Sequence, residues 1–381
     1  MKLTQLFKIY WPDNGGGIAT VIQQIADGFR DCEQEIIVCR DKRGKATKDD
    51  LYDRIPIHRS RQMFDFASTP FSFCFLRDVK KRTRNSDIVL YHFPYPMIDL
   101  AVLLGWYSGK LVVWWHCDYE QYKKLVPIYR PLVRHTLKVA DRILVSAEEN
   151  IDASSDLRKY RNKCAVVPFC VNDRYLNEGK EYLMQEQQKK DRVRILFIGR
   201  MVWYKGCDVL LRAFARMKNK NCELVLVGGG PLENEWRQMA ESLKLSNVRF
   251  TGMVSEDEKI EQIKECDFLV LPSISKAEAF ALVQIEAMAF GKPVINTDLP
   301  SGVPSVSIDG QTGITVKPEN ETELALAMDT LANDVPLRRK YGKNARKRVE
   351  QEYTKDRMIQ RCRKVFREIG VELEKNHESV L

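Results

Sequence analysis

The chain has 381 residues, more than one hydrophobic core usually organises, so we expect about two domains. With 44% apolar and 30% charged residues it is a folded globular protein, which excludes a disordered, collagen-like or coiled-coil chain. The net charge of +9 suggests an anionic partner without choosing between nucleic acid, phospholipid and phosphorylated small molecules.

Short β-branched runs alternate with helix-length segments along most of the chain, a pattern typical of βαβ units and parallel sheets. The first series is Leu3–Tyr10, Glu35–Cys39, Asp87–His92, Leu111–His116, Arg142–Ser146 and Ala165–Pro168. The second is Arg194–Ile198, Glu223–Val227, Val248–Thr251, Phe268–Leu271, Pro293–Asn296 and Gly313–Val316. We therefore predict an α/β fold of two doubly wound domains, residues 1–175 and 192–355, facing across a cleft, with the polar stretch 176–191 as linker.

The basic excess lies mostly in the first domain, where residues 1–175 hold 28 Lys and Arg against 21 Asp and Glu, a net +7. No acidic residue occurs between Glu120 and Asp141, and the cations from Lys123 to Lys138 alternate with apolar and aromatic residues. Such a stretch suits a helix on an anionic membrane surface. A partly solvated helix over the core is the competing interpretation.

The beginning of the chain lacks the unbroken apolar stretch of a signal peptide, and no apolar run reaches the roughly 18 residues of a membrane span. Ten cysteines are scattered without a C-x-x-C pair. We expect a cytoplasmic protein with reduced thiols that associates peripherally with the inner face of the cytoplasmic membrane.

Two glycine clusters, Gly15–Gly17 and Gly228–Gly230, each follow a predicted strand. Such glycines suit either a tight strand-to-helix turn or an anion-binding helix start. The dinucleotide fingerprint needs a third glycine three residues further on, where this chain has Thr20 and Glu233. Both failures disfavour a nicotinamide-dependent oxidoreductase. A two-domain sugar-binding protein without catalysis is the other alternative, disfavoured by the missing export signal.

Charged residues follow two of the second domain's strands. Arg200 and Lys205 come just after Arg194–Ile198, where a guanidinium fork and an ammonium can converge on a diphosphate. Glu278 precedes a strongly apolar helix that carries Glu286, and a carboxylate there needs hydrogen-bond partners such as ribose or sugar hydroxyls. Solvated surface charges are the alternative for the two cations.

These motifs together resemble the retaining glycosyltransferases of family 4, which have the GT-B fold. The matching run is Phe197-Ile-Gly-Arg200 to Lys205-Gly206, Val227-Gly-Gly-Gly-Pro-Leu, Val248-Arg-Phe-Thr-Gly252 and Glu278-x7-Glu286, with Trp11–Gly17 and Trp114–Asp118 matching the acceptor half. The chain is most similar to members that build bacterial O-antigens and capsules, including mannosyltransferases. The resemblance implies an acceptor-binding first domain, a nucleotide-sugar-binding second domain, and a C-terminal helix, 356–381, that crosses back to the first.

The resemblance also implies a role for each motif residue. Arg200 and Lys205 would hold the donor diphosphate and stabilise the leaving group. Glu278 would contact the hydroxyls of the transferred sugar, Glu286 would bind the ribose, and His116 would approach the reacting sugar. Backbone groups and neighbouring residues would complete the donor site: Gly16, Gly17, Gly199, Gly252, Met253, Phe280, Ala281 and Leu282. Asp118 is the candidate on the acceptor side.

The expected reaction moves a hexose from GDP-mannose or a UDP-hexose to a hydroxyl of a lipid-linked glycan, with retention at the anomeric carbon. No Asp-x-Asp motif occurs, so we expect no metal and no cofactor beside the nucleotide sugar. Ala279 and Ala281 stand where the family usually has glycines, which leaves the choice of donor open. Nucleic acid is not an expected partner, because the basic residues form no recognisable binding module.

Overall fold

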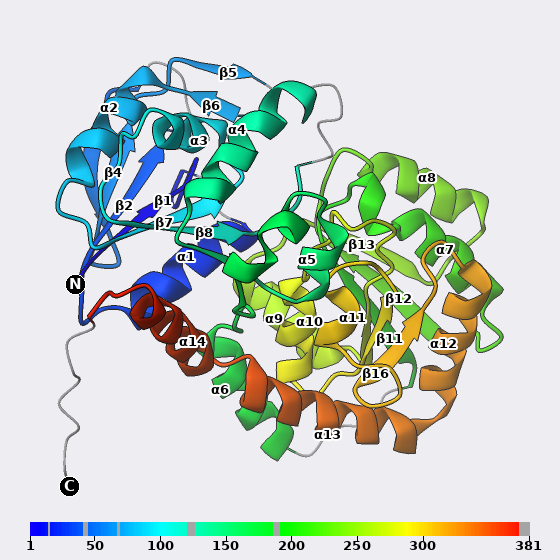
Figure 1. Ribbon diagram of the computed structural model, residues 1–381. Coiled ribbons are helices and arrows are strands. Elements are labelled where there is room, and N and C mark those ends of the chain that lie inside the picture. Colours follow the sequence, from blue (N-terminus) through cyan, green and yellow to red (C-terminus); the bar gives the residue numbers. More distant parts are fainter. Residues whose placement is uncertain (14–15, 41–44, 67–68, 120–125, 186–190, 373–381) are drawn as a thin grey trace, which may run out of the picture. The chain divides into compact units, whose positions relative to one another are not determined.

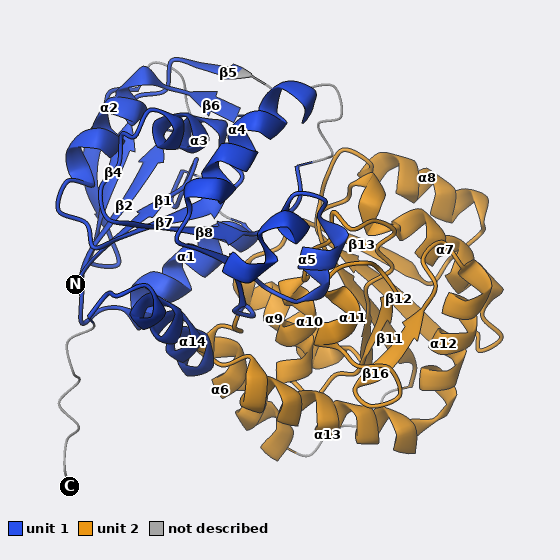
Figure 2. Cartoon of the chain, in the orientation of Figure 1, with its two compact units in different colours: residues 1–169, 356–381 blue, residues 170–355 orange. Residues whose placement is uncertain are grey.

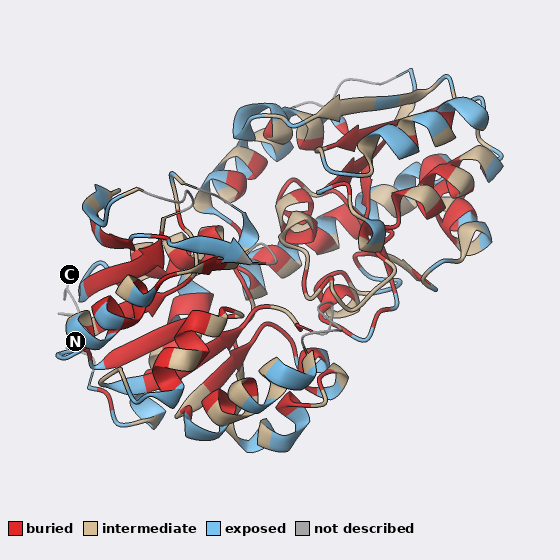
Figure 3. Ribbon diagram, turned by 90° about the horizontal axis from the view of Figure 1, so that it is seen from above, coloured by how far each residue is buried: buried red, intermediate tan, exposed pale blue. Residues whose placement is uncertain are grey.

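The computed structural model describes residues 1–372 apart from 14–15, 41–44, 67–68, 120–125 and 186–190 (Figure 1). The chain divides into two compact units (Figure 2). Unit 1 consists of residues 1–169 and the segment from residue 356 onward, and unit 2 consists of residues 170–355. In both units the strands are largely buried, and the helices around them expose one side (Figure 3).

Unit 1 is built on an eight-stranded sheet with the order β10-β9-β8-β7-β1-β2-β4-β3. Neighbours pair in parallel except β3 and β4, which pair antiparallel at one edge. The strands are β1 (Lys2–Leu6), β2 (Glu33–Cys39), β3 (Lys48–Tyr52), β4 (Ile55–Ser60), β7 (Ile88–Phe93), β8 (Lys110–Trp115), β9 (Arg142–Val145) and β10 (Cys164–Val166). A separate two-stranded antiparallel sheet is formed by β5 (Phe64–Phe66) and β6 (Thr69–Phe71).

The helices of unit 1 follow its strands in the βαβ manner. They are α1 (Gly17–Gly28), α2 (Phe73–Arg82), α3 (Pro96–Leu103), α4 (Val126–Val139), α5 (Glu149–Ala153), the 3₁₀ segment η2 (Leu157–Lys163) and α14 (Lys355–Glu368). The last of these packs at the end of α1, where the Phe366 and Phe29 rings lie 5.5 Å apart. Arg363 adds an ion pair with Asp31 at 2.7 Å. The C-terminal helix therefore belongs to unit 1.

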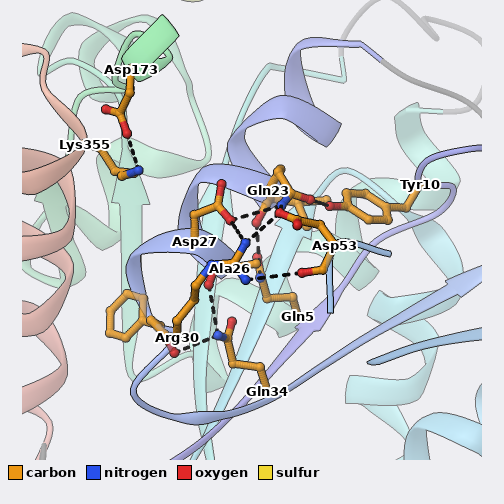
Figure 4. Close-up of polar contacts among 12 residues, drawn as sticks. Gln5, Tyr10, Gln23, Ala26, Asp27, Arg30, Gln34, Asp53, Asp173 and Lys355 are labelled. Carbon is orange, nitrogen blue, oxygen red and sulfur yellow. Dashed lines mark hydrogen bonds and ion pairs between the residues drawn. The ribbon is translucent and has the colours of Figure 1, made fainter. Parts of the chain in front are cut away.

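The end of α1 is also held by polar contacts (Figure 4). Arg30 donates to the carboxylates of Asp27 and Asp53, both at 2.6 Å. The Gln34 amide donates to the carbonyl oxygens of Ala26 and Phe29, which lack helical partners at a helix end. These contacts lie at the end of α1 that is opposite Gly17.

Unit 2 is built on a six-stranded, fully parallel sheet with the order β13-β12-β11-β14-β15-β16. Its strands are β11 (Val193–Ile198), β12 (Cys222–Val227), β13 (Val248–Gly252), β14 (Phe268–Val270), β15 (Val294–Thr297) and β16 (Gly313–Val316). Its helical segments are α6 (Asp173–Met184), η3 (Trp203–Lys205), α7 (Cys207–Arg216), α8 (Glu233–Ser242), α9 (Glu256–Glu265), α10 (Leu282–Ala289), α11 (Val303–Val306), α12 (Glu321–Asn333) and α13 (Val335–Glu352).

The predicted doubly wound α/β fold is confirmed, and every predicted strand overlaps an observed one. The structure differs from the prediction of a linker at 176–191, because much of this stretch lies in α6, a helix of unit 2. This helix buries only Tyr175 and Gly179, so its core-facing stripe is one aromatic ring and one glycine rather than aliphatic residues. A side chain at Gly179 would place its Cβ 2.3 Å from the carbonyl oxygen of Ala289. Residues 186–190 lie outside the described residues.

Among the described residues, no helix is long and apolar enough to span a membrane. All ten cysteines are free thiols, and each is buried or partly buried.

Candidate functional site

The order of the unit 2 sheet creates a switch point between β11 and β14. Successive strands run from β11 to one edge through β12 and β13, and to the other edge through β14, β15 and β16. The loops that leave β11 and β14 at their carboxyl ends therefore diverge, and such a point is where open α/β sheets bind ligands. Arg200 and Lys205 follow β11, while Glu278 follows β14.

Lys205 and Glu278 form a buried ion pair at this point. The Lys205 Nζ lies 2.5 Å from Glu278 Oε2, and Ser273 Oγ donates to the same oxygen at 3.0 Å. Burial alone lowers the pKa of the Lys205 amine, but attraction and hydrogen bonding to Glu278 outweigh it and leave the pKa above its ordinary value. Two residues predicted to serve different parts of the donor thus form one ion pair, in which Lys205 keeps its positive charge despite burial.

Glycines make room for this pair. Gly206 has φ +64, and a Cβ there would lie 2.1 Å from the carbonyl oxygen of Pro272, so only glycine fits. At Gly199 a Cβ would lie 3.2 Å from Phe197 Cζ, which is a tight contact, and 3.4 Å from Lys205 Cε, which is an ordinary one. The amide of Ile274 donates to the carbonyl of Tyr204 at 2.9 Å and ties the two loops together.

The start of α10 presents open backbone donors next to Glu278. The amides of Ala281 and Leu282 donate no hydrogen bond to any described residue, as expected in the first turn of a helix. Ala281 has φ +62, a left-handed conformation that costs a residue with a Cβ roughly 1–2 kcal/mol. Gln284 fixes the turn, because its amide donates to the Phe280 carbonyl at 3.0 Å and its oxygen accepts from Asn296 at 3.0 Å.

Glu286 lies on α10 and has a cationic neighbour that sequence reasoning missed. Lys259 Nζ of α9 is 2.8 Å from Glu286 Oε2 and 5.2 Å from the centre of the Tyr175 ring. Burial lowers the Lys259 pKa, but Glu286 and Glu256 raise it by more than burial lowers it, so the net shift is upward.

Arg200 is exposed and has no ion-pair partner in the described part of the chain.

The second glycine cluster supports the end of β13. Gly228 donates to the carbonyl of Gly252 at 2.9 Å, and Gly252 has φ +72. Met253, the next residue, is 84% exposed although it is apolar. The turn at Gly252 therefore has no side chain of its own, and the thioether of Met253 beside it is exposed to solvent.

Glu256 to Glu258 form the capped first turn of α9, where Ser255 and Glu258 make a capping box.

The unit 1 candidates lie at the carboxyl ends of β1 and β8. Gly16 and Gly17 are exposed at the start of α1, and Asp118 accepts a hydrogen bond from the Tyr119 amide at 2.8 Å. His116 is buried, its ring stacks on Phe169 at 5.3 Å, and its Nε2 lies 2.8 Å from His92 Nδ1. Burial lowers the His116 pKa to about 3, so this side chain is a neutral imidazole.

Comparison with known proteins decides the family. The model of "Glycosyltransferase Family 4" matches residues 15–175, and that of "Glycosyl transferases group 1" matches residues 180–348. O-antigen chain mannosyltransferase C of Escherichia coli is 32% identical over 359 residues, which are 94% of this chain and 96% of that protein. The chain belongs to the family 4 glycosyltransferases.

Other similar proteins agree with this glycosyltransferase assignment. D-rhamnosyltransferase WbpZ of Pseudomonas aeruginosa is 30% identical over 362 residues, covering 93% of this chain and 92% of that protein. Sucrose-phosphate synthase of Thermosynechococcus elongatus has a TM-score of 0.78 at 17% identity, covering 97% of this chain and 98% of that one. Anabaena HepE, solved in complex with UDP, has a TM-score of 0.73 at 17% identity, with 97% and 100% covered. The structural matches show that the two Rossmann-like units are those of the GT-B fold.

The basic stretch of the glycosyltransferase forms α4, and part of its charge is used inside unit 1. Arg130 and Arg134 contact the two carboxylate oxygens of buried Asp156 at 3.0 and 2.8 Å. Val133 and Leu137 face the core, whereas Ile128 is 80% exposed and Lys138 is exposed. Lys123 and Lys124 lie outside the described residues. α4 therefore packs over the core of unit 1, and it also exposes Ile128 and Lys138.

Sequence reasoning missed the residues that support the predicted ones: Ser273 beside Glu278, Lys259 beside Glu286, and His92 beside His116. A signal existed only for the last. His92 is a polar residue inside the otherwise apolar run Ile88–Phe93, and a polar side chain in a buried strand needs a hydrogen-bond partner.

Proposed function

We propose that this glycosyltransferase transfers a hexose of manno configuration, mannose or its 6-deoxy form, from a nucleoside diphosphate sugar to a lipid-linked glycan during O-antigen or capsule synthesis. The observation that carries the proposal is the near full-length similarity to a mannosyltransferase and a D-rhamnosyltransferase, each at least 30% identical. GDP-mannose is the first donor to test, ahead of a UDP-hexose. Family membership decides against the oxidoreductase and the non-catalytic binding protein.

In the proposed reaction, Arg200 and Lys205 stabilise the charge that develops on the departing diphosphate. Glu278 and the amides of Phe280, Ala281 and Leu282 position the sugar hydroxyls and the adjacent phosphate, and His116 contacts the sugar. Glu286 holds the ribose, the backbone at Gly199 and Gly252 with Met253 adjoins the nucleotide, and Gly16 and Gly17 approach the phosphate. Asp118 is assigned to the acceptor.

The proposed stereochemistry is retention by a front-face step. The acceptor oxygen forms its bond to the anomeric carbon on the face from which the phosphate oxygen leaves, and the acceptor proton passes to the departing diphosphate. Because Lys205 and Arg200 supply the positive charge, we propose that transfer needs neither a metal nor a cofactor. Undiminished transfer in EDTA is the expected result, and restoration of lost activity by a divalent cation would contradict it.

The donor is tested first by binding. A ligand of the folded state at 100 times its Kd stabilises by about 2.7 kcal/mol, so GDP, UDP and ADP can be ranked by thermal shift. Transfer of radiolabelled mannose from GDP-mannose to a lipid-linked glycan extract is then measured, and the anomeric configuration is read from the product by NMR. Transfer only from a UDP-sugar, or an inverted product, would refute the corresponding part of the proposal.

We also propose that the enzyme is cytoplasmic and binds the inner face of the membrane through α4. The support is the exposed pair Ile128 and Lys138 on a helix that has no acidic residue. Sedimentation with vesicles containing phosphatidylglycerol at low salt should fall for Ile128→Ser. Leu326→Ser, which changes a 64% exposed leucine of unit 2, is the matched control and should sediment like the wild type. Equal sedimentation of both variants would place the membrane contact elsewhere.

A further inference from the structure

Three polar side chains form a buried row across the centre of the unit 1 sheet, on the neighbouring strands β1, β7 and at the end of β8. The Gln5 amide nitrogen donates to the carbonyl oxygen of Ile22 on α1 at 3.3 Å, a contact included in Figure 4. Gln5 Oε1 lies 2.9 Å from His92 Nε2, and His92 Nδ1 lies 2.8 Å from His116 Nε2. All three side chains are at most 5% exposed.

The direction of every hydrogen bond in this row follows from its first member. The Ile22 carbonyl can only accept, so the NH₂ group of Gln5 faces it and the Gln5 oxygen faces His92. An amide oxygen also only accepts, so His92 carries its proton on Nε2. The Nδ1 of neutral His92 is then an acceptor, and His116 must donate to it from Nε2.

The consequence appears at the far end of the row. A neutral imidazole has one protonated and one unprotonated nitrogen, so His116 holds a lone pair on Nδ1. No described residue donates to this atom, and it is not among the fully buried polar atoms that lack a partner. Burial, and for His92 also its neighbour His116, keeps the pKa of both rings far below neutral pH, so neither becomes a cation that would reverse the row.

We propose that Gln5 and His92 are positioning residues that hold His116 in its Nε2-protonated form, so that Nδ1 accepts a hydrogen bond from a hydroxyl of the transferred sugar. This inference rests on the proposed function, in which His116 contacts that sugar. It specifies the direction of this hydrogen bond: the sugar group that faces His116 must be the donor. A hydrogen-bond donor in place of His92 Nδ1 would shift the proton of His116 from Nε2 to Nδ1 and so remove the acceptor.

The test compares two substitutions of His92 in the full chain. His92→Phe keeps a ring that stacks on both Trp114 and His116 but removes the hydrogen-bond acceptor, so nothing in the row then selects the tautomer of His116. We expect kcat/KM for sugar transfer to fall on the order of 10-fold or more, as for other groups that orient a functional histidine. His92→Asn places an amide oxygen near the former Nδ1 and should recover much of the loss. The Kd values for UDP and GDP should not change in either variant.

Gln34→Met is the matched control, because Gln34 is a similarly buried glutamine of unit 1 that donates to carbonyls of α1 but does not touch the row. It should transfer sugar like the wild type. Wild-type kcat/KM in His92→Phe, or an equal loss in His92→Phe and His92→Asn, would overturn the positioning role. A purely structural role of His92 would not depend on whether the new side chain carries a hydrogen-bond acceptor.

Nitrogen-15 NMR of histidine-labelled protein tests the row independently of transfer. For His116, identified by its loss in His116→Gln, the expected spectrum shows a protonated Nε2 and an unprotonated Nδ1 in the wild type and an altered pattern in His92→Phe. The opposite tautomer in the wild type would refute the inference. If the predicted tautomer is present and His116→Gln transfers sugar normally, the row stands and the role of His116 in the proposed function fails.

Discussion

The buried pair of Lys205 and Glu278 makes the sharpest stability prediction. Their side chains are only 11% and 10% exposed, so solvent screens the attraction little. Removing one partner of a buried ion pair costs about 3–5 kcal/mol, because the other charge is left uncompensated. In Lys205→Met the remaining carboxylate keeps its hydrogen bond from Ser273, which places the expected loss at the low end, about 3 kcal/mol.

Calorimetry of the purified variants measures this loss. For a domain of the size of unit 2, about 3 kcal/mol corresponds to a fall in Tm of roughly 6–12 °C. The double variant Lys205→Met/Glu278→Gln carries no buried charge at the site, so it should be more stable than Lys205→Met. Lys264→Met is the control: its ion pairs with Glu178 and Glu261 are at the surface, and its loss should stay below about 1 kcal/mol.

The same variants test the role in catalysis. If Lys205 stabilises the departing diphosphate, transfer by Lys205→Met should fall by about 10²–10³ even at temperatures where the protein is folded, and the double variant should not recover it. If the stability losses of Lys205→Met and Glu278→Gln simply add in the double variant, the two side chains are not energetically coupled and the reasoning is refuted. Wild-type transfer by Lys205→Met would refute the role of Lys205 at the diphosphate, but it would not affect the conclusion that the ion pair stabilises the fold.

Three further substitutions test the geometry. Gly206→Ala should lower the free energy of unfolding by at least about 2 kcal/mol, because its Cβ would meet the Pro272 carbonyl at 2.1 Å; a wild-type denaturation midpoint would show that the loop can shift. Ala281→Gly should raise the free energy of unfolding by up to about 1 kcal/mol by relieving the left-handed alanine, and a lower midpoint would mean that the methyl group packs favourably. Burial raises the pKa of Asp99 to about 6 despite hydrogen bonds from Tyr129, Thr136 and Tyr91, so the folded state takes up a proton more readily than the unfolded state. Lowering the pH from 7 to 5 should therefore stabilise the wild type by about 1 kcal/mol relative to Asp99→Asn, and parallel pH profiles of the two proteins would contradict the shift.

Local pattern determined much of this protein. Runs of β-branched residues predict the parallel strands, because a strand covered on both faces is apolar throughout. The series of short motifs along the chain resembles the family to which the comparisons assign it. Features with weak local signals escaped prediction. The β3–β6 strands include polar edge segments, and α6 buries a tyrosine and a glycine instead of an aliphatic stripe.

Only the tertiary structure decided which of these residues act together. Lys205 and Glu278 are 73 positions apart, and they meet because β11 and β14 are neighbours in a sheet whose order is not the order of the chain. Likewise His92 pairs across the β7–β8 register with Trp114, which brings His116 to its side. Such contacts depend on the pairing of distant strands, and a one-dimensional pattern of polar and apolar residues carries no information about which strands pair.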